Sequence, residues 1–348
     1  MLVDILDQNP PLPTPRQPSL ILKQYNTTLT PPVPVYLPHN LTTQEFLSLL
    51  PDPDTTDSTP AYTFPALRNW LTKLLKTLSL QQHVNHPFYA HPYRLRQLDI
   101  EAADWFVRNA PGMDDRLGFM KIQSTIETDA YLHDGEQKAR PDWVPGAVFL
   151  RGGSVGILII LQPEGATNED EKQVLLTMQP RIAAGSLNFT EIPAGMLDDE
   201  SGTFTGKAAQ EIKEEAHLDV TEDELLNMSA LALPVPKTSN SSSSEELREQ
   251  AIYPSPGACD EFMPLLLCQK RISRRHMAWL QDRATGLANE GEQIRLRLVP
   301  LTRMWREAGR DAKALAALCL YGNLRAEGCV PDMPTEVERE PEELRGSR

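Results

Sequence analysis

The sequence predicts an α+β fold, an αβα sandwich with a mixed sheet, preceded by a Pro-rich and helical N-terminal extension. From about Arg116 onward, short β-rich runs are interrupted by helical segments with loops of unequal length, which favours this layered architecture. The first 65 residues hold 13 of the 30 prolines, and such spacing prevents regular helix. With 348 residues, of which 40% are hydrophobic, the chain can bury a sizeable core.

Two segments are expected before the main domain. Residues 1–65 should form an irregular arm wrapped over a domain, rather than a PxxP ligand for a partner. Residues 66–115 should form a helical extension, because the segment 64–80 has the periodicity of an amphipathic helix. One face of that helix carries the apolar residues Leu67, Trp70, Leu71, Leu74, Leu75 and Leu78. This apolar density implies packing against the main domain or a second subunit.

The main domain is expected over residues 116–325. Strands are predicted at 118–126, 146–151, 155–161, 174–178, 187–192, 228–235, 262–269 and 294–301, and helices at 205–216, 273–282 and 311–321. Gly322 and Asn323 should end the last helix. The serine-rich stretch 239–244 is predicted to be a flexible insertion. Residues 326–348 are predicted to be a charged tail, disordered from about Val330.

Charge and composition exclude several classes of function. Asp and Glu outnumber Lys and Arg 48 to 34, a net charge of -14 that would repel nucleic acid. Phosphate chemistry would therefore need a metal ion or a few well-placed cations. The four cysteines form no CxxC pair, which is typical of free thiols in a reducing compartment. No apolar run approaches membrane-spanning length and no secretory signal is recognisable, so we expect a cytoplasmic protein without a membrane partner.

One predicted helix carries an unusual acidic cluster. Glu211, Glu214 and Glu215 converge on one side of the 205–216 helix, because residues three and four apart are neighbours on a helix. Their mutual repulsion would be relieved by a hard divalent cation such as Mg²⁺, with Mn²⁺ as a substitute, because such cations prefer oxygen ligands. Taken alone, the cluster fits a solvated acidic face better, with Lys207 and Lys213 each compensating one carboxylate.

The surroundings of this helix resemble the signature of the Nudix hydrolase family, G-x5-E-x7-R-E-U-x-E-E-x-G-U, with U a bulky aliphatic residue. The matching positions, in order, are Gly195, Glu211, Ile212, Glu214, Glu215 and Leu218. The interval after Gly195 is one residue longer than usual, which leaves the first glutamate ambiguously at Glu200. Gln210 replaces the signature arginine. His217 replaces the second glycine, where a left-handed helix cap is expected.

A closer similarity is to the ADP-sugar diphosphatases of this family, particularly the plant ADP-glucose-hydrolysing type. They share the run E-x-P-A-G-M-L-D-D, present here from Glu191, and the longer loop before the acidic helix. They also share a downstream S-P-G-x-x-x-E element, here from Ser255 to Glu261, and an upstream arginine in the position of Arg181. The resemblance covers about residues 116 to 325 and implies a Nudix-type αβα sandwich.

The resemblance also implies an activity and a set of site residues. The reaction would be Mg²⁺-dependent hydrolysis of the diphosphate bond in nucleoside diphosphate sugars of the ADP-ribose or ADP-glucose type, by a homodimer. Metal ligands would be Glu211, Glu215 and the carbonyl of Ala194, with Glu214 as an adjacent catalytic group. Glu261, on a Gly-bearing loop, would be the general base. Arg181 would bind phosphate, and Glu191 the sugar or ribose.

Alternative interpretations accompany these assignments. Without the resemblance, Glu261 would be an exposed loop acid, Arg181 a surface arginine and Glu191 a strand-end acid. Cys259 fits a small packing residue better than a nucleophile. The functional alternatives are a catalytically weakened Nudix-fold sensor of nucleotide sugars, which Gln210 and His217 favour, and an interaction protein that uses its N-terminal segments.

Overall fold

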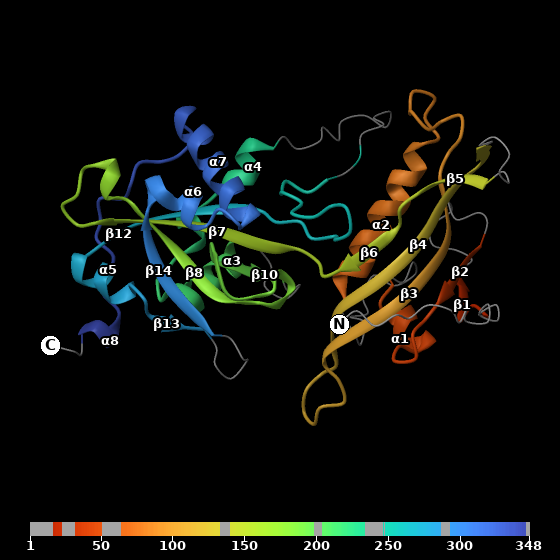
Figure 1. The fold of residues 1–348 in the computed structure, drawn as a ribbon, viewed down its shortest axis with the longest axis horizontal. Helices are drawn as coiled ribbons and strands as arrows, with labels where there is room; N and C mark the ends of the chain where they lie inside the picture. The colour runs from red at the N-terminus through yellow and green to blue at the C-terminus, as the bar shows by residue number, and fades with distance from the viewer. Residues whose placement is uncertain are drawn as a thin grey trace, which may run out of the picture. The chain divides into compact units, whose positions relative to one another are not determined.

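The computed structural model describes residues 17–22, 32–50, 64–132, 140–197, 204–233, 246, 248–286 and 293–345. It divides into two compact units, Met1–Leu150 and Arg151–Arg348 (Figure 1). None of the described helices is both long enough and apolar enough to cross a membrane.

The first unit is a sheet with two helices. Its strands are β1 (Leu20–Leu22), β2 (Val33–Tyr36), β3 (Arg94–Val107), β4 (Arg116–Leu132), β5 (Arg140–Val144) and β6 (Ala147–Leu150). They follow the order β1-β2-β3-β4-β5, with β6 also paired to β4. The helices are α1 (Thr43–Ser48) and α2 (Pro65–Leu80). The predicted helix at 64–80 is confirmed: it begins at Pro65, where the missing N–H has no helical partner to lose. Leu67, Leu71 and Leu75 join a core with Leu98 and Ile122.

The structure corrects three expectations for this region. The described residues of 1–65 are not an irregular arm, since β1 and β2 belong to the sheet and α1 is a capped helix. Residues 94–107 form a strand, so the extension is helical only over α2. Register shifts along β3 put the buried residues Leu95, Leu98, Ile100 and Ala103 at mixed intervals of two and three, which hides the alternation of a strand. Residues 116–150 lie in the first unit rather than with the residues that follow.

The second unit is built on a mixed sheet. Its described strands are β7 (Ser154–Pro163), β8 (Gln173–Arg181), β9 (Ser186–Glu191), β10 (Ala194–Met196), β11 (Leu225–Asn227), β12 (Leu265–Ile272), β13 (Ala284–Thr285) and β14 (Ile294–Pro300). The order is β11-β12-β7-β8-β14-β13, with β10 paired to β7 and β9 to β8. Strands β7 and β12 run parallel, and the other described pairs are antiparallel.

Helices cover both faces of this sheet. Described helices are α3 (Phe204–Ala216), α4 (Met228–Ala232), α5 (Arg274–Leu280), α6 (Met304–Glu307), α7 (Ala312–Ala326) and α8 (Glu342–Arg345), with single 3₁₀ turns at Glu169–Glu171, Ile182–Ala184, Glu222–Glu224 and Leu301–Arg303. Strand β7 is buried along its whole length. Ile157 and Ile159 pack in the core that includes α3 and α5, while Leu158 and Ile160 pack in the core that includes α4, α6 and α7. The predicted αβα sandwich with a mixed sheet is therefore confirmed.

Two element predictions in this unit are wrong. Residues from Met228 to Ala232 form helix α4 instead of a strand, because the Asn227 side chain caps it by accepting a hydrogen bond from the Ala230 N–H at 2.9 Å. Helix α7 continues through Gly322 and Asn323. It ends at Ala326 and is followed by Gly328, whose φ is +75°, in a motif where the Cys329 N–H donates to the Leu324 carbonyl at 2.8 Å.

The described part of the acidic C-terminal segment, residues 330–345, is ordered, contrary to the expectation of disorder from Val330. Val337 forms a bridge with Arg271, and Glu338 accepts a hydrogen bond from the buried Lys270 ammonium at 2.9 Å. Glu340 accepts one from the Ser273 hydroxyl at 2.7 Å. The segment has few apolar residues, but its carboxylates find basic partners in and after β12. The predicted insertion at 239–244 lies outside the described residues.

Candidate active site

A glutamate of α3 lies directly against strand β10. Gly195 pairs with Val155 of β7, and Ala194 pairs with Gly156. A Cβ placed on Gly195 would lie 2.0 Å from Oε1 of Glu211, closer than atoms can approach. Only glycine therefore lets this carboxylate rest on the strand backbone. Two of the expected metal ligands, Glu211 and the residue before Gly195, are thus brought together by the fold.

The other acidic residues of α3 have different surroundings. The Glu215 side chain is buried, at 5% exposure. Glu214 is half-buried, and its Oε1 accepts a hydrogen bond from Gln210 at 2.8 Å. Lys207 Nζ lies 3.1 Å from Glu211 Oε1, with both side chains 12% exposed. Lys213 instead lies 3.3 Å from Asp219 on the surface. A solvated acidic face thus describes neither Glu211 nor Glu215.

The oxygen donors where α3 packs against β10 fit a hard divalent cation. Burying carboxylates is costly unless a positive charge accompanies them, and here Lys207 supplies that charge for Glu211. Across the described ranges, no group of three or more His, Cys, Asp or Glu side chains is already arranged to hold a metal. A cation at this site would rely on oxygen donors from both the strand and the helix, which is the ligand type that Mg²⁺ prefers.

The predicted left-handed cap of α3 is confirmed. His217 has a φ of +53°, in the region that glycine adopts most easily. Its ring meets Trp279 of α5 edge-on, with 5.7 Å between centroids. Burial lowers the pKa of His217, and the nearby Arg283 lowers it further. The histidine therefore takes the conformation of the signature glycine and adds a contact to α5.

Glu261 is held at the end of β7 that pairs with β10. Its Oε1 accepts a hydrogen bond from the Ser154 hydroxyl at 2.6 Å and lies 3.1 Å from Nη1 of Arg151. Ser154 is the register partner of Met196, the residue after Gly195. Glu261 and Glu211 therefore approach neighbouring positions of the β7–β10 pair, although they are 50 residues apart in the sequence. The Glu261 side chain is 12% exposed, so it is not the exposed loop acid of the alternative interpretation.

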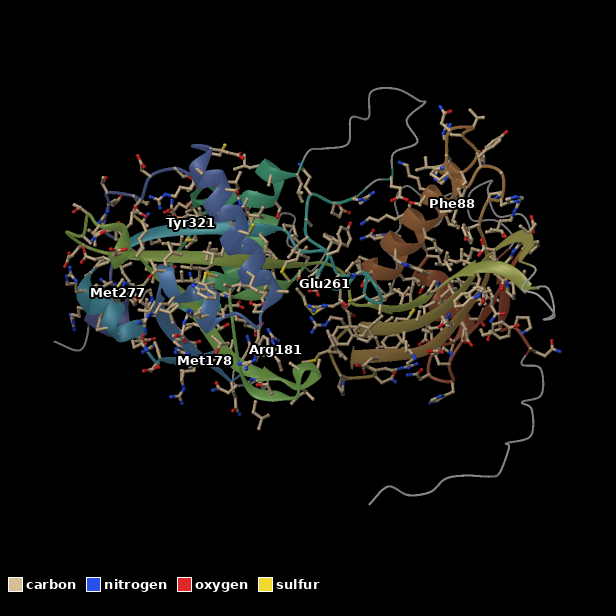
Figure 2. The ribbon with its side chains drawn as sticks, turned by 45° about the horizontal axis from the view of Figure 1, so that its top comes forward. Phe88, Met178, Arg181, Glu261, Met277 and Tyr321 are labelled. Carbon is tan, nitrogen blue, oxygen red and sulfur yellow. The ribbon has the colours of Figure 1, made fainter. Side chains whose placement is uncertain are left out.

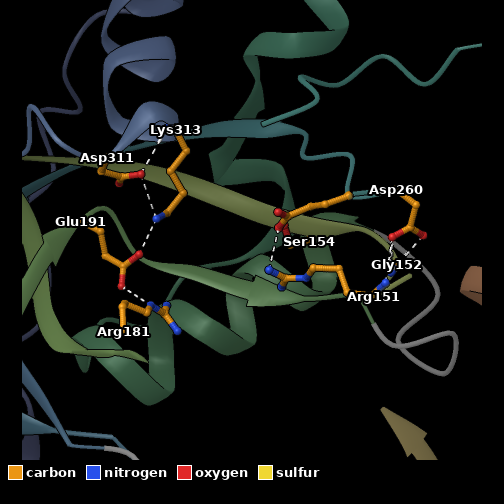
Figure 3. Close-up of polar contacts among 9 residues, drawn as sticks. Arg151, Gly152, Ser154, Arg181, Glu191, Asp260, Asp311 and Lys313 are labelled. Atoms are coloured by element: carbon orange, nitrogen blue, oxygen red, sulfur yellow. Dashed lines mark hydrogen bonds and ion pairs between the residues drawn. The ribbon is translucent and has the colours of Figure 1, made fainter. Parts of the chain in front are cut away.

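Asp260 anchors the loop that carries Glu261. Its Oδ1 accepts hydrogen bonds from the backbone N–H groups of Arg151, at 2.8 Å, and Gly152, at 3.2 Å (Figure 3). Burial raises the pKa of Asp260, whereas these two N–H groups oppose that shift. Asp260, Arg151 and Ser154 were not among the site residues predicted from the sequence. Nothing local in the sequence marks these contacts, because they join segments about 108 residues apart.

Arg181, the last residue of β8 (Figure 2), and Glu191, the last residue of β9, belong to a second cluster (Figure 3). Arg181 Nε donates to Glu191 Oε1 at 2.7 Å, and Lys313 Nζ donates to Glu191 Oε2. Asp311, the N-cap of α7, accepts from Lys313 Nζ and from the Ile192 N–H, both at 3.1 Å. Asp311 and Lys313 were not predicted from the sequence as site residues. The one local feature that could have drawn attention to them is the position of Asp311 as the N-cap of a predicted helix.

Two further residues complete the comparison with the sequence. Glu200, the ambiguous first glutamate of the signature, lies outside the described residues. Cys259 is half-buried, and desolvation raises the pKa of its thiol, which is the opposite of what a nucleophilic cysteine needs.

Comparison with known proteins adds independent evidence. No family model matches the chain. Over 236 residues it is 34% identical to "Nudix hydrolase 14, chloroplastic" from Arabidopsis thaliana, a match that covers 68% of this chain and 65% of that relative. The chain thus spans slightly less than two thirds of the relative's length. The chain is therefore similar, over 236 residues, to a member of the family whose signature the residues around Gly195 and Glu211 resemble.

Proposed function

We propose that this chain is a Mg²⁺-dependent Nudix hydrolase that cleaves the diphosphate bond of nucleoside diphosphate sugars, giving a nucleoside monophosphate and a sugar phosphate. ADP-ribose and ADP-glucose are the substrates to test first. The observation that carries the proposal is the seating of the Glu211 carboxylate on Gly195, beside Ala194 and at the strand end that also holds Glu261. The similarity to a Nudix hydrolase supports the reaction class.

Each site residue has a role in this proposal. The carbonyl of Ala194 and the carboxylates of Glu211 and Glu215 would hold the metal, with Glu214 adjacent. Bound Mg²⁺, or Mn²⁺ in its place, would neutralise phosphate oxygens and lower the pKa of a bound water. Glu261 accepts a proton from the attacking water. Because Ser154 and Arg151 both contact its Oε1, Oε2 is the oxygen that we assign to this step. Arg181 donates hydrogen bonds to phosphate.

A panel of nucleotide sugars assayed with and without Mg²⁺ tests the proposal. Replacing a residue that hydrogen-bonds to a metal ligand typically costs 10- to 100-fold in activity. Glu215 is proposed to be a ligand itself, so we expect Glu215→Gln to lower activity about 100-fold or more. Glu261→Gln should lose about 100- to 10,000-fold, the range for a general base. Glu327→Gln, an exposed glutamate after α7, is the matched control and should be unaffected. Unchanged turnover in Glu215→Gln would remove the metal-site assignment.

A catalytically weakened sensor is the second candidate, favoured by Gln210. Its amide donates a hydrogen bond to Glu214 of the same helix, and as an uncharged group it cannot form the ion pair that the signature arginine would form. Calorimetry that detects ADP-sugar binding, combined with no product under the same conditions, would favour the sensor over the enzyme.

Assembly and location stay predictions. We propose a homodimer, which light scattering on the purified chain would test. We also retain the expected cytoplasmic location as a proposal; the word chloroplastic in the relative's name applies to that protein, and imaging of the tagged full-length chain would decide for this one.

A further inference from the structure

We propose that Lys313 is a positioning residue that orients Arg181 through Glu191. The proposal rests on the proposed function, because it assumes that Arg181 binds a substrate phosphate. It also changes the role of Glu191, which on this view supports Arg181 and does not touch the sugar.

Burial shows which member of the cluster can meet a ligand. The side chains of Glu191, Asp311 and Lys313 are 4%, 5% and 10% exposed, whereas that of Arg181 is 41% exposed. Glu191 uses one carboxylate oxygen for Arg181 and the other for Lys313, and because its side chain is only 4% exposed, a sugar hydroxyl has little access to either oxygen. Arg181 is therefore the one member that reaches solvent.

The geometry of Arg181 suits a phosphate ligand. Its Nε donates to Glu191, and within the described part of the chain its two Nη groups make no hydrogen bond or ion pair. A guanidinium held by Nε still presents paired donors to an oxyanion. Glu191 thus fixes the plane of the guanidinium, and the position of Glu191 depends in turn on Lys313.

Lys313 connects this contact to helix α7. It lies in the first turn of α7, next to the N-cap Asp311, and its Nζ bridges Asp311 and Glu191. Asp311 also accepts the Ile192 N–H, two residues before Ala194. The start of α7 therefore holds both the side chain of Glu191 and the backbone that leads to the candidate metal ligand. Two cations and two anions balance the charge of the cluster.

Kinetics on the full-length protein with Mg²⁺ and ADP-ribose or ADP-glucose test this role. We expect Lys313→Met to raise KM about 10-fold with a smaller change in kcat, because small misplacements of a substrate-positioning group can cost up to ~100-fold. Lys313→Arg should restore part of the lost affinity. In an Arg181→Ala background, Lys313→Met should have no further effect on KM, because the two residues act in series. Additive effects on KM would overturn the proposal.

A charge-balanced double variant separates positioning from stability. Lys313→Met alone leaves a buried carboxylate without its cation and should lower the melting temperature. Glu191→Gln combined with Lys313→Met removes one charge of each sign, so the melting temperature should recover in part while KM stays high; Asp311 still lacks its cation but keeps the hydrogen bond from the Ile192 N–H. Recovery of both would mean a structural role only. If the wild-type protein neither binds nor hydrolyses any nucleotide sugar, the proposed function fails; if it does, and Lys313→Met leaves KM unchanged, only this inference fails.

Discussion

Gly195 and Glu211 show how one absent side chain can define a site. Gly195 pairs with Val155, yet its missing Cβ makes room for a carboxylate from α3. The match to the family signature predicted that both residues matter, but not that they touch. That contact depends on how α3 packs on the sheet, which residue types and spacing alone do not specify.

Gly195→Ala tests this contact directly. The new methyl group would meet the end of a flexible side chain, so we expect Glu211 to move and the fold to persist. The expected result is a higher Mg²⁺ concentration for half-maximal activity, with a small change in melting temperature. Gly322→Ala in α7, outside the site, is the matched control, because a Cβ there meets nothing within 4 Å. Equal effects of the two substitutions on the Mg²⁺ requirement would contradict the assignment.

At the scale of elements, caps and bulges decided where the sequence-based predictions failed. The strongly periodic helices at 64–80 and 205–216 and the buried strand at 155–161 were predicted well, because their apolar spacing matches their burial. Strand β3 was missed because its bulges disturb the alternation. The predicted end of helix α7 was too early. Gly322 is tolerated inside the helix because the packing of the helix outweighs the low helix propensity of glycine.

Two glycines, one inside α7 and one just after it, should have opposite effects on stability when replaced by alanine. Gly322 lies inside the helix with open space at its Cβ position, so Gly322→Ala should raise the free energy of unfolding by about 0.5–1 kcal/mol. Gly328 has a φ of +75° at the helix end, so Gly328→Ala should lower it by about 1–2 kcal/mol. Urea unfolding of both variants measures the difference. Stabilisation by Gly328→Ala would refute the cap.

At the scale of the whole molecule, pairing between distant charges organises the second unit. The C-terminal glutamates contact Lys270 and Ser273, and Lys313 contacts Glu191 across 122 residues of sequence. His276 of α5 is fully buried near this C-terminal segment, and neither ring nitrogen makes a hydrogen bond within the described residues. Desolvation lowers the pKa of His276 below its ordinary 6.5, opposed by Glu340 and Glu338.

We expect the buried His276 to lower the free energy of unfolding as the pH falls below neutral. Because the pKa of His276 is lower in the folded state, its contribution is present above about pH 6.5 and is lost as the pH falls through the folded value. His276→Leu should therefore flatten the decline of the unfolding free energy between about pH 7 and 5. His217 shifts in the same direction, so part of the slope should remain. The pKa values of Asp260 and Asp311 are raised, so these groups favour the folded state as the pH falls. They do so equally in the wild-type protein and in His276→Leu, and therefore do not affect the comparison. An identical pH dependence of the unfolding free energy in the wild-type protein and in His276→Leu would contradict the lowered pKa of His276.

By itself the sequence determined the αβα layers of the second unit, the acidic helix and its left-handed end, because these follow from apolar periodicity and from a linear signature. Only the tertiary structure decided that Glu211 rests on Gly195, that Ser154 and Arg151 hold Glu261, and that Lys313 reaches Glu191. It also decided that the N-terminal segments join a sheet of their own. The physical reason is that a hydrogen bond or ion pair acts over about 3 Å in space, and no local pattern records which distant residues folding brings that close.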